Sequence, residues 1–69
     1  MKKAKMSARV WTNKQCKQTL KEGIANGFQV IKYGMMTKIM DGETLVVSWL
    51  KGSAAMGNLV RINTEYFEA

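Results

Sequence analysis

The chain of 69 residues contains no histidine, no proline and a single cysteine. One cysteine cannot close an intrachain disulfide, and one cysteine without histidine cannot supply the four ligands of a tetrahedral zinc site. The lack of histidine also removes the side chain that most often serves as a general base near neutral pH. We therefore expect a protein without cofactor or metal that is not an enzyme.

Long hydrophobic runs are also missing. The longest apolar stretch lies in residues 45–50 and is interrupted by Ser48, far short of the roughly 20 residues that span a bilayer. Met1-Lys2-Lys3 has the charge of a signal-peptide start, but no apolar segment follows it. Together with the lone Cys16, this predicts a cytoplasmic protein with no membrane partner.

Acidic residues are few and unevenly placed. The chain has 11 lysines and arginines, five aspartates and glutamates, and a formal net charge of +6. Residues 1–21 hold seven of the basic residues and no acid, whereas residues 22–69 hold four basic residues and all five acids. The positive charge thus belongs to an N-terminal segment attached to a nearly neutral remainder, which favours an anionic partner.

Length and composition indicate one small domain of the α+β class. Apolar residues make up 46% of the chain, which is ordinary for a globular domain. We expect residues 1–5 to form a basic tail and residues 6–69 to form the domain. Residues 6–11 suit either a short fourth strand at a sheet edge or the lead-in to a helix.

The clearest local pattern predicts an amphipathic helix over residues 13–25. Thr12 and Gln15 match a capping box, in which each side chain bonds to the backbone N–H of the other residue. Asn26-Gly27 provides a stop, since glycine adopts the left-handed conformation at little cost. The apolar stripe of this helix recurs every four residues and consists of Cys16, Leu20 and Ile24.

The remainder of the chain has the pattern of strands. We expect a three-stranded antiparallel sheet with strands over residues 28–40, 43–50 and 58–64, and a bulge or bend at Gly34. Asp41-Gly42 predicts a hairpin turn that pairs Met36 with Val47. In this register the principal core cluster consists of Met36, Leu45, Val47 and Trp49.

Both faces of such a sheet carry apolar side chains, and one short helix covers only one of them. The second face needs a cover, which is either the N-terminal segment with Tyr66-Phe67, a second subunit or another partner. A homodimer is therefore one of the expected arrangements.

Three helix lysines form the best candidate site. Lys14, Lys17 and Lys21 fall within an arc of about 60° beside the apolar stripe. No acid lies three or four residues away from any of them, and the like-charged pair Lys17 and Lys21 costs a few tenths of a kcal/mol. A solvated face that keeps the protein soluble is the alternative interpretation.

We predict that these lysines, with Lys5 and Arg9, contact phosphates of a nucleic acid or a nucleoprotein complex. The second hypothesis is a small inhibitor or adaptor of the kind found in phages and mobile elements. Such a protein would bind a host protein with an acidic surface through its apolar sheet face. The contact would include Met35, Met36, Ile39 and Met40.

Three other features have a functional and a structural interpretation. Cys16 lies between two lysines that lower a thiol pKa, but its place in the apolar stripe favours an inert, packed thiol. Trp11 suits stacking on a base, although most tryptophans are largely buried. Gly52 and Gly57 have the spacing of a phosphate-binding loop, but Asn58-Leu59 replaces the required lysine and hydroxyl residue, so we expect a surface loop.

Overall fold

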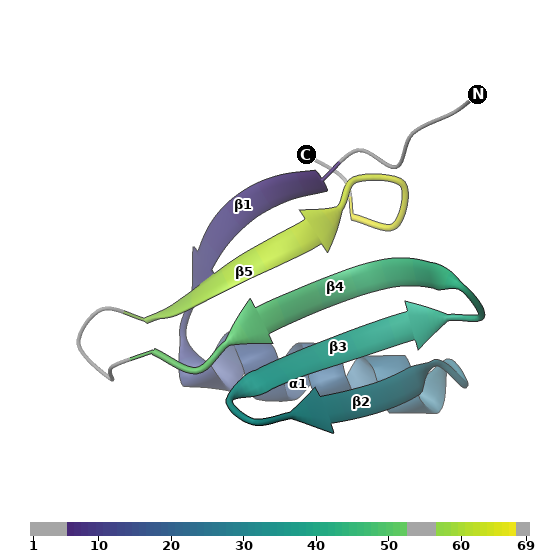
Figure 1. Ribbon diagram of the computed structural model, residues 1–69, viewed down its shortest axis with the longest axis horizontal. Coiled ribbons are helices and arrows are strands. Elements are labelled where there is room, and N and C mark those ends of the chain that lie inside the picture. The colour runs from purple at the N-terminus through teal and green to yellow at the C-terminus, as the bar shows by residue number, and fades with distance from the viewer. Residues whose placement is uncertain (1–5, 53–56, 68–69) are drawn as a thin grey trace.

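The computed structural model describes residues 6–52 and 57–67 and has the α+β class expected from the sequence. One helix packs on a single antiparallel sheet whose strand order is β1-β5-β4-β3-β2 (Figure 1). The expectation of three strands was wrong, because the described residues form five. The elements are β1 (Met6–Trp11), α1 (Asn13–Ala25), β2 (Gln29–Tyr33), β3 (Met36–Asp41), β4 (Thr44–Leu50) and β5 (Asn58–Asn63).

Helix α1 has the bounds that the capping pattern predicts. The Gln15 amide donates to Thr12 Oγ1 over 3.2 Å, and the Thr12 amide donates to Gln15 Oε1 over 2.8 Å. Both bonds satisfy N–H groups that have no partner within the helix. Gly27 follows the helix with a φ of 83°, so the left-handed stop is confirmed.

Residues 6–11 form a strand at the sheet edge, β1, and not the lead-in to the helix. It pairs antiparallel with β5, from Met6 opposite Asn63 to Trp11 opposite Asn58. The chain then enters α1 directly through the cap residue Thr12. The N-terminal residues 6–11 therefore extend the sheet instead of covering its open face.

The segment expected as one bent strand over residues 28–40 is in fact a hairpin. Tyr33 pairs with Met36, so Gly34 and Met35 form a two-residue turn between β2 and β3. Gly34 has a φ of 60°, which is the positive value that a type II′ turn requires at its first position. The glycine therefore reverses the chain, whereas a bulge would only have bent it.

The expected register of the next hairpin was also wrong. Asp41 pairs with Thr44, so the turn residues are Gly42 and Glu43, and Gly42 takes the first turn position with a φ of 63°. An irregularity after Ile39 then places Ile39 opposite Val47. Because the bulge adds one residue to β4, adjacent Val46 and Val47 are both buried.

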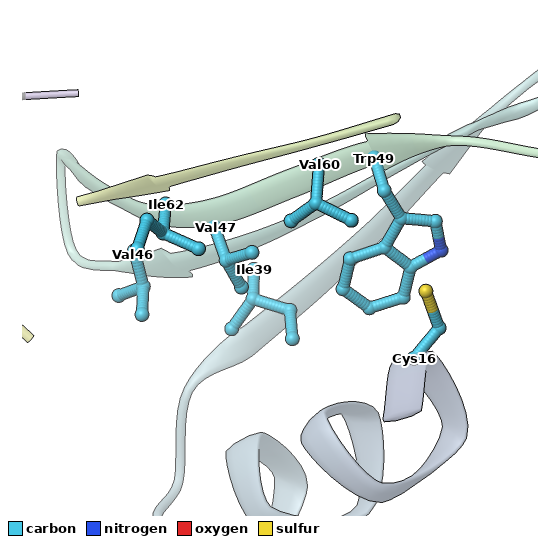
Figure 2. Close-up of a cluster of buried hydrophobic side chains, with 7 residues drawn as sticks. All are labelled: Cys16, Ile39, Val46, Val47, Trp49, Val60 and Ile62. Carbon is cyan, nitrogen blue, oxygen red and sulfur yellow. The ribbon is translucent and has the colours of Figure 1, made fainter. Parts of the chain in front are cut away.

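The core lies between α1 and one face of the sheet (Figure 2). Met36 and Leu45 are only partly buried and do not belong to its fully buried set, which corrects the predicted core. Phe67 packs against this core, so the C-terminal segment also lies on the helix side. The buried apolar residues are Cys16, Ile39, Val46, Val47, Trp49, Val60 and Ile62.

Candidate functional site

The three helix lysines gather on one exposed side of α1. Lys14, Lys17 and Lys21 line a shallow depression of about 370 Å³ with Asn13 and Gln18. Among the described residues, none of the three forms an ion pair. Glu22 is the only acid on the helix, and Gln18 Nε2 donates to Glu22 Oε2 over 3.0 Å.

A larger groove of about 620 Å³ opens beside this depression. Lys17 and Asn13 line both hollows, so the two form one continuous surface. The groove adds Lys32 from β2 and Lys51 after β4, and none of the described residues that line it is acidic. Its other lining residues are Cys16, Leu20, Gly34, Met35, Thr37, Trp49 and Asn58.

Backbone bonding within the sheet explains why Lys32 and Lys51 line a groove that helix residues also line. Lys32 pairs with Thr37, which pairs with the buried Trp49, so the register places Lys32 on the helix side of the sheet. The backbone N–H of Lys51 donates to Met35 O over 3.0 Å. This bond fixes the end of β4 beside the β2–β3 turn.

Asn58 holds the other wall of the groove. Its side chain is 2% exposed, and Nδ2 donates to Trp11 O over 3.1 Å and to Asn13 Oδ1 over 2.9 Å. Its Oδ1 accepts from the Gly52 amide over 2.9 Å. One buried amide thus joins the end of β1, the start of α1 and Gly52 after β4.

We define the basic surface as Lys14, Lys17, Lys21, Lys32 and Lys51. Sequence patterns gave the first three, but Lys32 and Lys51 were missed. A signal for Lys32 existed in the alternation of β2, where Val30 and Lys32 share a face. A bend at Gly34 would not reveal this signal, because only the observed β2–β3 hairpin turns this face toward α1.

Arg9 is absent from the described lining of both hollows. Arg9 Nη1 donates to Ser7 Oγ over 2.6 Å and to Ala8 O over 2.8 Å, and Arg9 lies at the opposite sheet edge from Lys32. Five strands at about 4.8 Å spacing separate these edges by about 19 Å. Lys5 lies outside the described residues.

Trp11 and Cys16 take the structural roles. Trp11 is partly buried, and its ring centroid lies 6.5 Å from that of Trp49 and 5.9 Å from that of Phe67. Cys16 is 6% exposed, and its sulfur points toward the Trp49 ring (Figure 2). Burial raises the pKa of this thiol above its ordinary value, which opposes the reactive interpretation.

The residues expected at a protein interface separate into three environments. Met35 is exposed in the β2–β3 turn, whereas Met36 and Met40 are partly buried. Ile39 is 1% exposed and packs against Gly23 of the helix, so it offers no surface to a partner. The expected loop between Gly52 and Gly57 falls largely on residues 53–56, outside the described residues.

Comparison of the chain with protein-family models, curated proteins and solved structures gives no match. Within the described ranges, α1 is too short and too polar to cross a membrane. The same ranges hold no group of three or more metal-ligating side chains.

Proposed function

We propose that this protein binds nucleic acid through the basic surface. The observation that carries the proposal is the convergence of five lysines from α1, β2 and the residue after β4 around two adjoining hollows, which no acid among the described residues lines. Gathering five like charges on one surface is electrostatically unfavourable, and binding of a polyanion would offset this cost.

The chemistry of the basic surface favours phosphate contacts over base recognition. Lysine ammonium groups act as strongly hydrated point charges without the planar geometry that reads a base edge. The positive end of the α1 dipole faces the same end of the molecule and adds to the field there. We therefore expect binding with little sequence preference.

A salt titration tests this proposal. If all five lysines contact phosphates, log K should fall with log salt with a slope of about −4.5 for a duplex and about −3.5 for a single strand. Fluorescence anisotropy of labelled 20-nucleotide probes measures both slopes. Absence of binding to either probe at about 50 mM salt would reject the proposed function.

A pair of matched variants locates the contact. Lys17→Glu with Lys32→Glu should reduce the magnitude of the salt slope by about two, since two phosphate contacts are lost. Lys38→Glu with Arg61→Glu changes the net charge equally, at positions outside the lining of either hollow. Equal losses in the two variants would show that net charge, and not this surface, drives binding.

A further inference from the structure

The sheet face turned away from α1, which we term the outer face, is open in the part of the chain that the structure describes. Figure 1 shows α1 on the opposite side, behind the sheet. Strand pairing aligns one apolar residue from every strand into a row across the outer face. This apolar row is Val10, Leu59, Leu50, Met36 and Tyr33, in which Val10 is 65% and Tyr33 is 80% exposed.

The neighbouring row carries positive charge. Arg61 pairs with Ser48, and Ser48 pairs with Lys38, so two cations flank a serine near the middle of the outer face. Ala8 and Ile31 complete this row at the two sheet edges. By the alternation of the strands, Lys38 and Arg61 are the only charged residues that the five strands direct to this face.

We propose that the outer face binds an amphipathic segment of another protein that carries aliphatic side chains beside carboxylates. The aliphatic side chains would cover the apolar row, and the carboxylates would meet Lys38 and Arg61. This arrangement follows the charge complementarity of specific interfaces. It is independent of the proposed nucleic-acid site, which lies on the helix side of the sheet.

The charge and the size of the outer face both argue against dimerisation of the chain through this face. Two outer faces packed together would confine two copies of Lys38 and Arg61 with no acid from either face, which is costly when water is excluded. The outer face measures roughly 19 by 20 Å, or about 400 Å², from strand spacing and rise. Stable interfaces bury about 800 Å² on each partner.

The side chains of the outer face also oppose nucleic acid as the occupant. Single strands bind through aromatic platforms on which successive bases stack. The apolar row contains one aromatic residue, Tyr33, at a sheet edge, and its other members are aliphatic. A helix of 10–12 Å diameter matches the face better, since it can lie within the width of about 19 Å.

Two synthetic peptides provide the probe. One is an 18-residue amphipathic helix with leucines on one side and glutamates flanking them, and the other has every glutamate replaced by lysine. The labelled glutamate peptide should bind at least about tenfold more tightly than the lysine peptide. Its addition should shift the side-chain methyl signals of Leu50 and Leu59 in nuclear magnetic resonance spectra. Equal binding of both peptides, or no binding, would overturn the proposal.

Three double variants assign the contact. Lys38→Glu with Arg61→Glu should weaken binding of the glutamate peptide at least about tenfold. Leu50→Thr with Leu59→Thr should weaken it by the same factor, and threonine keeps a side chain that is compatible with a β-strand. Lys14→Glu with Lys21→Glu is the matched control, which should keep peptide affinity within about twofold and lose nucleic-acid affinity. Failure of one site can thus be distinguished from failure of the other.

Light scattering and an oligonucleotide titration test the other occupants. The protein should remain monomeric at about 100 μM, and a single-stranded oligonucleotide should leave the side-chain methyl signals of Leu50 and Leu59 unchanged. A dimer that Leu50→Thr with Leu59→Thr dissociates would assign the outer face to a second copy and overturn the proposal. Shifts of these signals by the oligonucleotide would overturn it in favour of nucleic acid.

Discussion

Gly23 lies where α1 meets the buried side chain of Ile39. A Cβ at this position would lie 3.2 Å from both Ile39 Cδ1 and Ile39 Cγ2. Alanine gains about 1 kcal/mol of helix propensity over glycine, but overpacking a well-filled core typically costs about 1–3 kcal/mol. Because Ile39 is almost fully buried, we expect Gly23→Ala to lower the free energy of unfolding by about 1 kcal/mol, as measured by urea denaturation.

The Ile39→Val background serves as the control for Gly23→Ala. Valine lacks Cδ1 and therefore removes one of the two close contacts. The cost of Gly23→Ala should shrink or change sign in that background, which a double-mutant cycle measures as coupling. An unchanged cost would mean that steric contact with Ile39 does not explain the glycine.

The buried thiol of Cys16 should make the folded protein less stable at alkaline pH. Burial raises the pKa of its thiol in the folded protein, so the unfolded chain releases this proton at a lower pH than the folded chain. The stabilising contribution is complete below the unfolded pKa and disappears as the pH rises through the folded pKa. The unfolding free energy of the wild type should therefore fall above about pH 9 more steeply than that of Cys16→Ala.

Urea denaturation of both proteins at intervals between pH 7 and pH 10.5 measures that difference. Tyr66 also has a raised pKa, because its hydroxyl donates to Asp41 Oδ2 over 2.7 Å. It is present in both proteins, so its contribution cancels in the comparison. Parallel pH profiles for the two proteins would contradict a buried, protonated thiol.

At the scale of elements, the helix was predictable and the hairpins were only partly so. The bonds that set both ends of α1 form between residues close in sequence, such as Thr12 with Gln15. A hairpin register depends on which turn position the glycine occupies, and Gly34 and Gly42 both take the first one. A shift of this kind changes which side chains face the core, so Met36 was assigned to the wrong face.

The edge position of β1 required tertiary information. Its partner β5 lies about 50 residues away along the chain, and no local sequence pattern predicts such a pairing. Its own alternation, with Ser7, Arg9 and Trp11 less exposed than their neighbours, is a signal that favours a strand over a helix lead-in. The same long-range pairing places Arg9 in the edge strand β1, outside the described lining of both hollows.

At the scale of the whole molecule, the described residues Lys17 and Lys51 of the basic surface lie at one end of the sheet, and two exposed acids lie at the other. The β2–β3 turn, the end of β4 and the start of α1 meet at one end, where the basic surface holds Lys17 and Lys51. The β3–β4 turn and the segment after β5 lie at the other end (Figure 1), where Glu43 and Glu65 are exposed. Net charge alone does not describe this polarity, since it requires the path of the strands.

This polarity makes the effect of the distant acids depend on ionic strength. A seven-residue strand β4 separates the ends by about 20 Å, whereas the Debye length is about 8 Å at 0.15 M salt and about 30 Å at 0.01 M. Glu43→Gln with Glu65→Gln should therefore change nucleic-acid affinity less than about twofold at 0.15 M and increase it clearly at 0.01 M. Fluorescence anisotropy at the two salt concentrations measures both values.

Lys17→Gln with Lys51→Gln is the matched comparison, because it also removes two charges. It should weaken nucleic-acid binding by about tenfold or more at 0.15 M, since direct phosphate contacts are lost and no screening restores them. A polyanion that sensed only the total charge would respond to the two variants with equal and opposite changes in affinity at every salt concentration. Such symmetry would contradict a localised basic surface, whereas a loss in the lysine variant that exceeds the gain in the glutamate variant at both salt concentrations would support it.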